Sequence, residues 1–65
     1  TWEMISTLGQ YYWAMREAAA WRYSAAYEIE VNDDPAASEM ALERSKARFE
    51  KAKELKRELR RVLGE

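Results

Sequence analysis

The residues of this chain that could carry chemistry are mainly carboxylates and amines, twelve Asp and Glu against eleven Lys and Arg. Histidine and cysteine are absent, which removes the usual zinc sites and the commonest general base. No Ser, Thr or Lys stands beside a recognisable base, and a carboxylate dimetal site would need acids directed inward from several helices. Glu30 and Arg16 lie nearest to the apolar positions, and each is explained by a side chain whose stem lies along apolar surface while its charged end reaches solvent. We therefore expect no enzyme, no cofactor and no metal site.

A loose basic strip in the second half of the chain raises the question of nucleic-acid binding. Five glutamates run close beside the strip, and the net charge is only −1, whereas phosphate-binding domains carry a clear positive excess. The aromatic first half carries more acid than base, which disfavours a membrane surface. We expect no nucleic acid and no membrane as partner. The strip consists of Lys46, Lys53, Lys56, Arg57 and Arg60.

The sequence predicts a soluble chain. No apolar run reaches the ~18 residues of a membrane span, and the lack of cysteine favours neither a reducing nor an oxidising compartment. Residues 1–33 carry two basic and five acidic side chains, whereas residues 34–65 carry nine basic and seven acidic ones. The halves, with net charges of −3 and +2, should attract each other weakly, as an intramolecular pair would.

The elements that must position these side chains are set by one break, the segment VNDDP at 31–35. Asn32 is suited to the left-handed conformation that ends a helix. Asp34 is an N-cap followed by Pro35 at the first helical position, Thr1 caps the start and Gly64 closes the end. We predict a single all-α domain over 1–65, an antiparallel two-helix hairpin with helices at about 2–31 and 35–63, standing alone or completed to a bundle by a partner or by self-association.

Gly9 is the one uncertain position inside the first helix. It either kinks the first helix or separates a short leading segment, and the second case would give a compact three-helix monomer. Nothing else nearby resembles a turn. The stretch LGQYY around it shares Leu8, Gly9 and Tyr12 with the tetratricopeptide signature. Trp21 and Glu28 stand where that repeat requires alanine, and no second copy follows. We therefore set a solenoid repeat aside.

The two predicted helices differ in how much of their circumference is apolar. The second has one stripe under half the circumference wide, formed by Ala41, Ser45, Ala52, Leu59 and Leu63 with Leu42, Phe49, Leu55 and Val62 beside them. The first is apolar over about two-thirds of its circumference. Its rows are Met4, Leu8, Tyr11, Met15, Ala18, Ala25 and Ile29; Ile5, Tyr12, Ala19, Tyr23 and Ala26; and Trp2, Trp13, Ala20 and Tyr27. One neighbouring helix cannot cover so wide a face.

Positions whose numbers add to about 65 should face each other, with large residues against small ones. On this basis we predict Tyr12, Tyr23 and Tyr27 in the core. Thr7 falls on the polar remainder of the first helix.

The aromatic surplus lies in QYYWAMREAAAWRYSAAY at 10–27, which holds two tryptophans and four tyrosines. Tyr and Trp dominate binding hot spots. We predict Trp2, Trp13 and Trp21 at a protein interface, because one partner helix leaves them uncovered. Arg16 and Arg22 interrupt the aromatic positions and are either solvated charges or donors beside the rings.

The segment NDDPAASEMALERSKARFEKAKELKRELRRVLGE at 32–65 resembles a computationally designed helical miniprotein. It shares the short capped loop, the Asp-Pro helix start, the exposed face of Glu, Lys and Arg, and the closing Leu-Gly. The aromatic first helix departs from that style, which implies a designed binder whose first helix is its working surface, or a natural phage or mobile-element protein whose helix docks on a target.

The function predicted from these features is a protein-binding module that presents the aromatic face of the first helix to another protein. Its candidate contact residues are Trp2, Trp13, Arg16, Trp21 and Arg22. The alternative is a structural homodimer in which two hairpins bury the same surplus against each other in a four-helix bundle.

Overall fold

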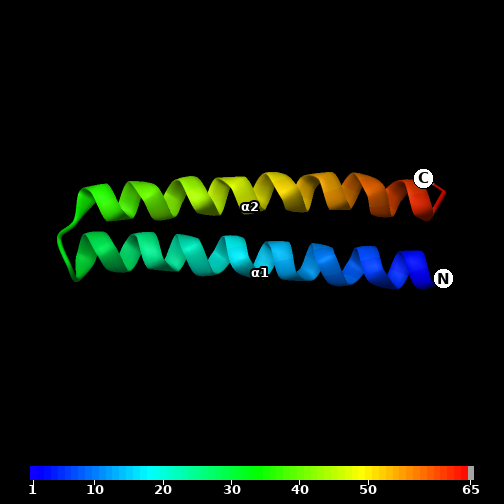
Figure 1. Cartoon of the computed structure of the whole chain (residues 1–65), viewed down its shortest axis with the longest axis horizontal. Coiled ribbons are helices and arrows are strands. Elements are labelled where there is room, and N and C mark those ends of the chain that lie inside the picture. Colours follow the sequence, from blue (N-terminus) through cyan, green and yellow to red (C-terminus); the bar gives the residue numbers. More distant parts are fainter. Residues whose placement is uncertain (65) are drawn as a thin grey trace.

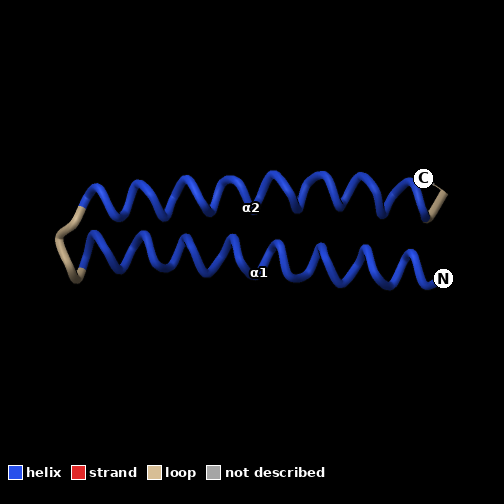
Figure 2. Tube along the Cα trace, in the orientation of Figure 1, coloured by secondary structure: helices blue, strands red, loops and turns tan. Residues whose placement is uncertain are grey.

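The chain folds into two long helices that lie side by side in a computed structural model describing residues 1–64. Helix α1 spans Trp2–Glu30 and α2 spans Pro35–Val62. The helices run antiparallel and nearly straight (Figure 1), so that the N-terminus lies beside the end of α2. The tube view shows one short loop joining them (Figure 2) and no strand among the described residues. The principal extents are 47 × 14 × 12 Å. The predicted all-α hairpin is confirmed.

Both helices begin at side-chain caps that the sequence predicts. The Thr1 hydroxyl accepts a hydrogen bond from the Met4 amide at 3.3 Å, and the Asp34 carboxylate accepts one from the Ala37 amide at 3.1 Å. Each cap satisfies an amide that has no partner within its helix. Pro35 follows as the first residue of α2, where its missing N–H removes no helical bond.

The loop differs from the prediction by one residue. Asp33, not Asn32, adopts the left-handed conformation, with φ 50°. The turn is closed by main-chain bonds, since the Val31 amide donates to the Tyr27 carbonyl oxygen and the Asp34 amide to the Glu28 carbonyl oxygen, both at 2.8 Å. The bond from the Asp34 amide reaches back six residues to Glu28, and the left-handed residue of the turn is Asp33, directly before Asp34. At the far end Gly64, with φ 83°, follows α2 as predicted.

Helix α1 runs through Gly9 without a break. A methyl group built at Gly9 would meet no atom within 4 Å, so no neighbouring group requires a glycine there. The compact three-helix monomer is therefore wrong, and the aromatic residues on both sides of Gly9 share one helix.

The line of contact between the helices, here called the seam, is built mainly from small side chains, with Leu55 as the largest buried residue among those described. Its buried members repeat at intervals of three and four residues, or of seven, as in packed antiparallel helices. None of the largest side chains is buried. The buried residues are Thr7, Ala14, Ala18 and Ala25 on α1 and Ser38, Ala41, Ser45, Ala52 and Leu55 on α2.

Two serines of α2 form hydrogen bonds to the main chain of α1 across the seam. The Ser45 hydroxyl donates to the Ala18 carbonyl oxygen at 2.7 Å, and the Ser38 hydroxyl donates to the Ala25 carbonyl oxygen at 2.8 Å. The position numbers of these pairs add to 63, and those of the Glu17–Arg48 and Trp21–Arg44 contacts to 65. The predicted register is thus confirmed, and the backbones lie close enough for a serine hydroxyl to bridge them.

The prediction of three tyrosines in the core is wrong. Tyr12, Tyr23 and Tyr27 are exposed, Tyr23 to 75 %, whereas Thr7, assigned to the polar face, is 7 % exposed. The cause is that α1 meets α2 through a different face from the predicted one, which corresponds to a rotation of the helix about its own axis relative to the prediction. Close approach of two helices favours small side chains at the contact, so Ala14, Ala18 and Ala25 face α2. Tyr11, Met15 and Trp21 flank this contact half-buried, and Tyr12, Tyr23 and Tyr27 are turned outward.

Candidate protein-interaction surfaces

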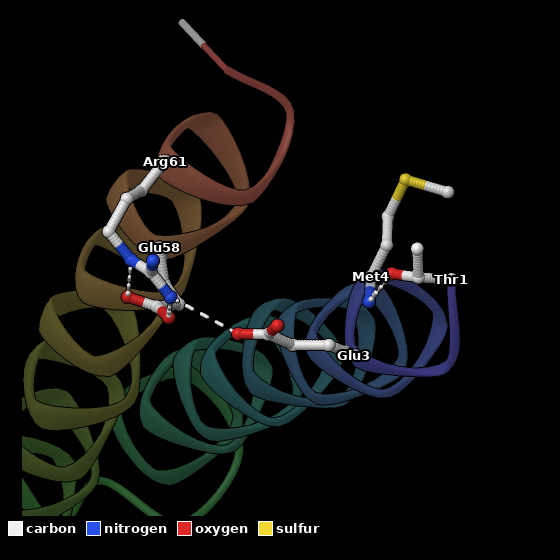
Figure 3. A network of polar contacts seen from close by, with 5 residues as sticks. All are labelled: Thr1, Glu3, Met4, Glu58 and Arg61. Atoms are coloured by element: carbon white, nitrogen blue, oxygen red, sulfur yellow. Dashed lines mark hydrogen bonds and ion pairs between the residues drawn. The ribbon is translucent and has the colours of Figure 1, made fainter.

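The polar groups of the hairpin make surface networks, of which the most connected joins the two helix ends (Figure 3). The Arg61 guanidinium, on α2, donates to Glu3 Oε1 on α1 at 3.1 Å and to both carboxylate oxygens of Glu58. The hydrogen bond from Arg61 lowers the pKa of Glu58, and the two carboxylates raise that of Arg61. All three side chains are well exposed, so this is a surface ion-pair network that connects the two helices.

Within residues 1–64, no three His, Cys, Asp or Glu side chains are grouped closely enough to hold a metal ion. Neither of the two helices is both long and apolar enough for a membrane crossing.

Tyr12, Trp13 and Arg16 form a cluster on the exposed side of α1, with Trp13 reaching the edge of a depression beside the seam. The rings of Tyr12 and Trp13 meet edge to face with centroids 5.8 Å apart. Arg16 donates to the Tyr12 hydroxyl at 3.1 Å, and its guanidinium carbon lies 5.8 Å from the Trp13 ring centroid. Trp13 is 59 % exposed. Two of the predicted contact residues, Trp13 and Arg16, are thus brought together, and Tyr12 joins them.

Trp2 stands apart from this cluster near the start of α1. It is 81 % exposed, the largest value among the exposed large apolar side chains. Tyr23 and Tyr27 lie three and four turns further along α1 from Tyr12, and both remain exposed. The aromatic exposure therefore extends along the full length of the helix.

Trp21 differs from the other two tryptophans. It is half-buried and lines the groove where α1 meets α2, and the Arg44 guanidinium lies 4.8 Å from its ring centroid. A ring held between the helices and stacked by an arginine contributes to the hairpin itself. The expectation that a single neighbouring helix leaves Trp21 uncovered is wrong.

Two grooves run along the hairpin, one on each side of the seam. The first, which we name the ion-paired groove, is crossed by the Glu17–Arg48 pair at 3.1 Å and by Arg44 over Trp21. It contains depressions lined by Trp21 and Arg44 near the loop and by Trp13, Glu17 and Arg48 further along. Charges from both helices meet there and neutralise each other.

The second groove, which we name the basic groove, has apolar walls. It contains two adjoining depressions of about 160 and 240 Å³ that share Arg22, Ser45 and Phe49. Met15 and Ala19 complete the α1 wall, and Leu42 and Lys46 the α2 wall. Arg22, the last of the predicted contact residues, thus lies in this groove, apart from Trp13 and Arg16.

The sequence reasoning missed the α2 side of this surface, because it assigned Leu42 and Phe49 to the stripe buried by α1. Phe49 is 46 % exposed. The sequence does contain a signal for this surface, because Leu42, Phe49, Lys56 and Leu63 repeat every seven residues. Leu42 and Lys56 each follow a buried seam residue, Ala41 and Leu55.

No protein-family model, no curated protein and no solved structure matches this chain.

Proposed function

We propose that this hairpin is a protein-binding module whose contact surface is the exposed apolar face of α1. The observation that carries the proposal is the size of the exposed surface. The chain exposes 5176 Å², whereas a monomeric protein of 7.7 kDa typically exposes about 4,300 Å². The excess of about 850 Å² accompanies the elongated 47 × 14 × 12 Å shape, which leaves large apolar side chains of α1 such as Trp2 and Trp13 uncovered.

The types of the exposed side chains support the same proposal. Trp, Tyr and Arg are the residues most enriched at binding hot spots, and Tyr12, Trp13 and Arg16 already touch one another in the free hairpin. Contacts that exist before binding leave less side-chain freedom to be lost at the interface. Trp2, Trp13 and Arg16 are the anchors on the outer face, and Arg22 contributes from the basic groove. A designed binder, which the second half of the chain resembles, would present its working surface in this way.

The competing proposal is the symmetric four-helix bundle of two hairpins. The same excess of surface supports it, because a second copy would cover the exposed apolar residues equally well. The charge of the basic groove opposes it, since a second copy brings like charge to that groove. We therefore rank a foreign partner first.

Sedimentation equilibrium and acrylamide quenching test the proposal on the isolated chain. A Trp21→Phe variant keeps only Trp2 and Trp13 as indoles, so its fluorescence reports the outer face. We expect a folded monomer at micromolar concentration whose two indoles are freely quenched. A tight dimer with both indoles protected would contradict the proposal and support the four-helix bundle.

A binding selection then tests the surface. A partner selected from a displayed protein library should lose at least about tenfold in affinity when Trp13 or Arg16 becomes alanine, as hot-spot residues do. Arg57→Ala, on the solvated face of α2, is the control. Selected partners whose affinity is unchanged by both α1 substitutions would overturn the assignment of the contact surface to α1.

A further inference from the structure

The basic groove is long enough to hold a whole helix. Its α1 wall continues at seven-residue intervals through Leu8, Met15, Arg22 and Ile29, and its α2 wall through Leu42, Phe49, Lys56 and Leu63. Residues seven apart lie on one face of a helix, and the 22 residues from Leu8 to Ile29 span about 31 Å along the helix axis. A trough of that length between two antiparallel helices fits a third helix.

The floor and walls of the groove suit an apolar stripe. The small buried residues at the floor, Ala18 and Ser45, leave the depressions open, while Met15 and Phe49 stand at the sides. Leu8, Ile29, Leu42 and Leu63 are exposed, so the rows remain uncovered towards both ends. A partner helix with large apolar residues along one face would fill the space that the alanines leave.

The rim of the groove is positively charged. Arg22 and Lys46 line it directly, and Lys53 Nζ lies 5.6 Å from the ring centroid of Phe49. Lys56 lies in the Leu42–Phe49–Leu63 row, and Arg60 stands seven residues beyond Lys53. Among the described residues neither Arg22 nor Lys46 pairs with a carboxylate. Glu39 is the single acid in the Lys46–Lys53–Arg60 row.

The ion-paired groove shows that this imbalance is local. There Glu17 meets Arg48 and Glu3 meets Arg61, so two basic side chains have an acidic partner across the seam. Of the others, Arg44 lies over the Trp21 ring and Lys51 pairs with Glu54 on its own helix. Four members of the basic strip on α2, Lys46, Lys53, Lys56 and Arg60, stand in the rows along the basic groove. Lys53 also pairs with Glu50 of its own helix at 3.3 Å. The glutamates at 43, 50, 54 and 58 occupy other positions of the heptad.

From the apolar walls and the positive rim we infer that the basic groove binds an amphipathic α-helix of a partner protein whose apolar stripe is flanked by acidic residues. This inference rests on the proposed function and names the class of partner. A second copy of the chain suits the groove less well, because it would place Arg22 and the α2 lysines of both copies together, and like charges at an interface oppose association.

Two synthetic peptides of about 22 residues, enough to span the groove, test the inference. Both carry the same leucine and alanine stripe. One has glutamate at every flanking position and the other has lysine. Binding of each fluorescein-labelled peptide to the full chain is followed by fluorescence anisotropy. We expect the acidic peptide to bind at least about tenfold more tightly at 0.1 M salt, roughly the sum of several exposed ion pairs. The ratio should shrink at about 0.5 M salt, where the charges are screened.

Charge reversal locates the bound peptide. Lys46→Glu should weaken the acidic peptide by about three- to tenfold and strengthen the basic one. Lys51→Glu makes the same change of charge on the ion-paired groove and is the matched control, with an expected effect below about twofold. Equal binding of the two peptides, or an equal effect of the two variants, would overturn the inference.

Two further outcomes identify other occupants and also overturn it. The first is a dimer that Ala19→Glu dissociates and Ala47→Glu does not, which would place a second copy in the groove. The second is binding to anionic phosphatidylserine vesicles that Lys46→Glu abolishes while the acidic peptide shows no affinity, which would identify a membrane surface. If neither peptide binds but a selected partner still depends on Trp13, this inference fails and the proposed function stands.

Discussion

The Ser45 hydroxyl donates a hydrogen bond to the Ala18 carbonyl oxygen of the opposite helix at 2.7 Å. Seven residues away on each helix, Ser38 makes the same bond to Ala25 at 2.8 Å. A serine side chain reaches a main-chain oxygen across a helix pair only when the two backbones approach closely. These bonds therefore fix both the spacing and the register of the hairpin, and they require small residues around them.

Substitutions at Ser45 test this arrangement. Ser45→Ala removes the bond and should cost about 1 kcal/mol of unfolding free energy. Ser45→Leu should cost about 1–3 kcal/mol because a larger side chain overpacks the seam. Urea denaturation followed by circular dichroism measures both. Ser6→Ala, on an exposed turn of α1, is the control for the better helix propensity of alanine. Equal stabilities for Ser45→Ala and Ser6→Ala would contradict a structural role for the bond.

The loop provides a second test of the structure, because Asp33 and its neighbour Asn32 have different backbone conformations. Asp33 has φ 50°, a region where glycine is free of the strain that other residues carry. Asp33→Gly should therefore leave stability unchanged or raise it by up to about 1 kcal/mol, despite the extra freedom of the unfolded chain. Asn32→Gly should lower stability, since its φ is not in that region. Thermal unfolding of the two variants gives the comparison, and the opposite order would place the left-handed residue at Asn32.

The Glu3–Arg61–Glu58 network predicts a small dependence of stability on pH. The hydrogen bond from Arg61 lowers the pKa of Glu58 in the folded chain. A group with a lowered folded-state pKa contributes stability above its unfolded pKa and loses that contribution as the pH falls through its folded pKa. We expect the wild-type chain to lose more stability than Glu58→Gln between neutral pH and about pH 3, below the ordinary pKa of glutamate. Glu43→Gln, away from the network, should behave like the wild type, and an unchanged pH profile in Glu58→Gln would contradict the assignment.

The sequence predicts the helices and their N-terminal caps correctly because both depend on local chemistry, and the short loop then sets the register. Thr1, Asp34 and Pro35 act within one turn of their own positions, and the single break at 31–35 leaves a hairpin as the simplest arrangement. The face of α1 that meets α2 is not local. Counting apolar residues gives most weight to the large ones and predicts Tyr12 inside and Thr7 outside, opposite to the structure.

The reason is that two helices share only one narrow line of contact. That line is most closely packed when small residues occupy it, so Ala14, Ala18 and Ala25 lie inside although Met15 and Tyr12 are more apolar in area. The sequence shows that α1 has more apolar surface than one neighbour can cover. It does not show which part remains uncovered, because that depends on how closely the backbones approach.

The three tryptophans give the last prediction, since the structure separates their roles. Trp21→Ala removes a half-buried ring that Arg44 stacks upon, and should cost about 1–2 kcal/mol of unfolding free energy, less than full burial of a large side chain is worth. Trp13→Ala removes a mostly exposed ring, and its effect on stability should stay within about 0.5 kcal/mol, as for most surface substitutions.

Binding should show the reverse order. Trp13 stands in the cluster with Tyr12 and Arg16, so Trp13→Ala should reduce the affinity of a selected partner by at least about tenfold. Trp21→Phe keeps a ring between the helices and should leave that affinity within about threefold. Because urea denaturation and binding are measured on the same variants, a loss of binding caused by unfolding is separated from a lost contact. A Trp13→Ala chain that is stable and still binds would show that Trp13 is not part of the interface. A Trp21→Ala chain as stable as the wild type would show that Trp21 does not contribute to packing between the two helices.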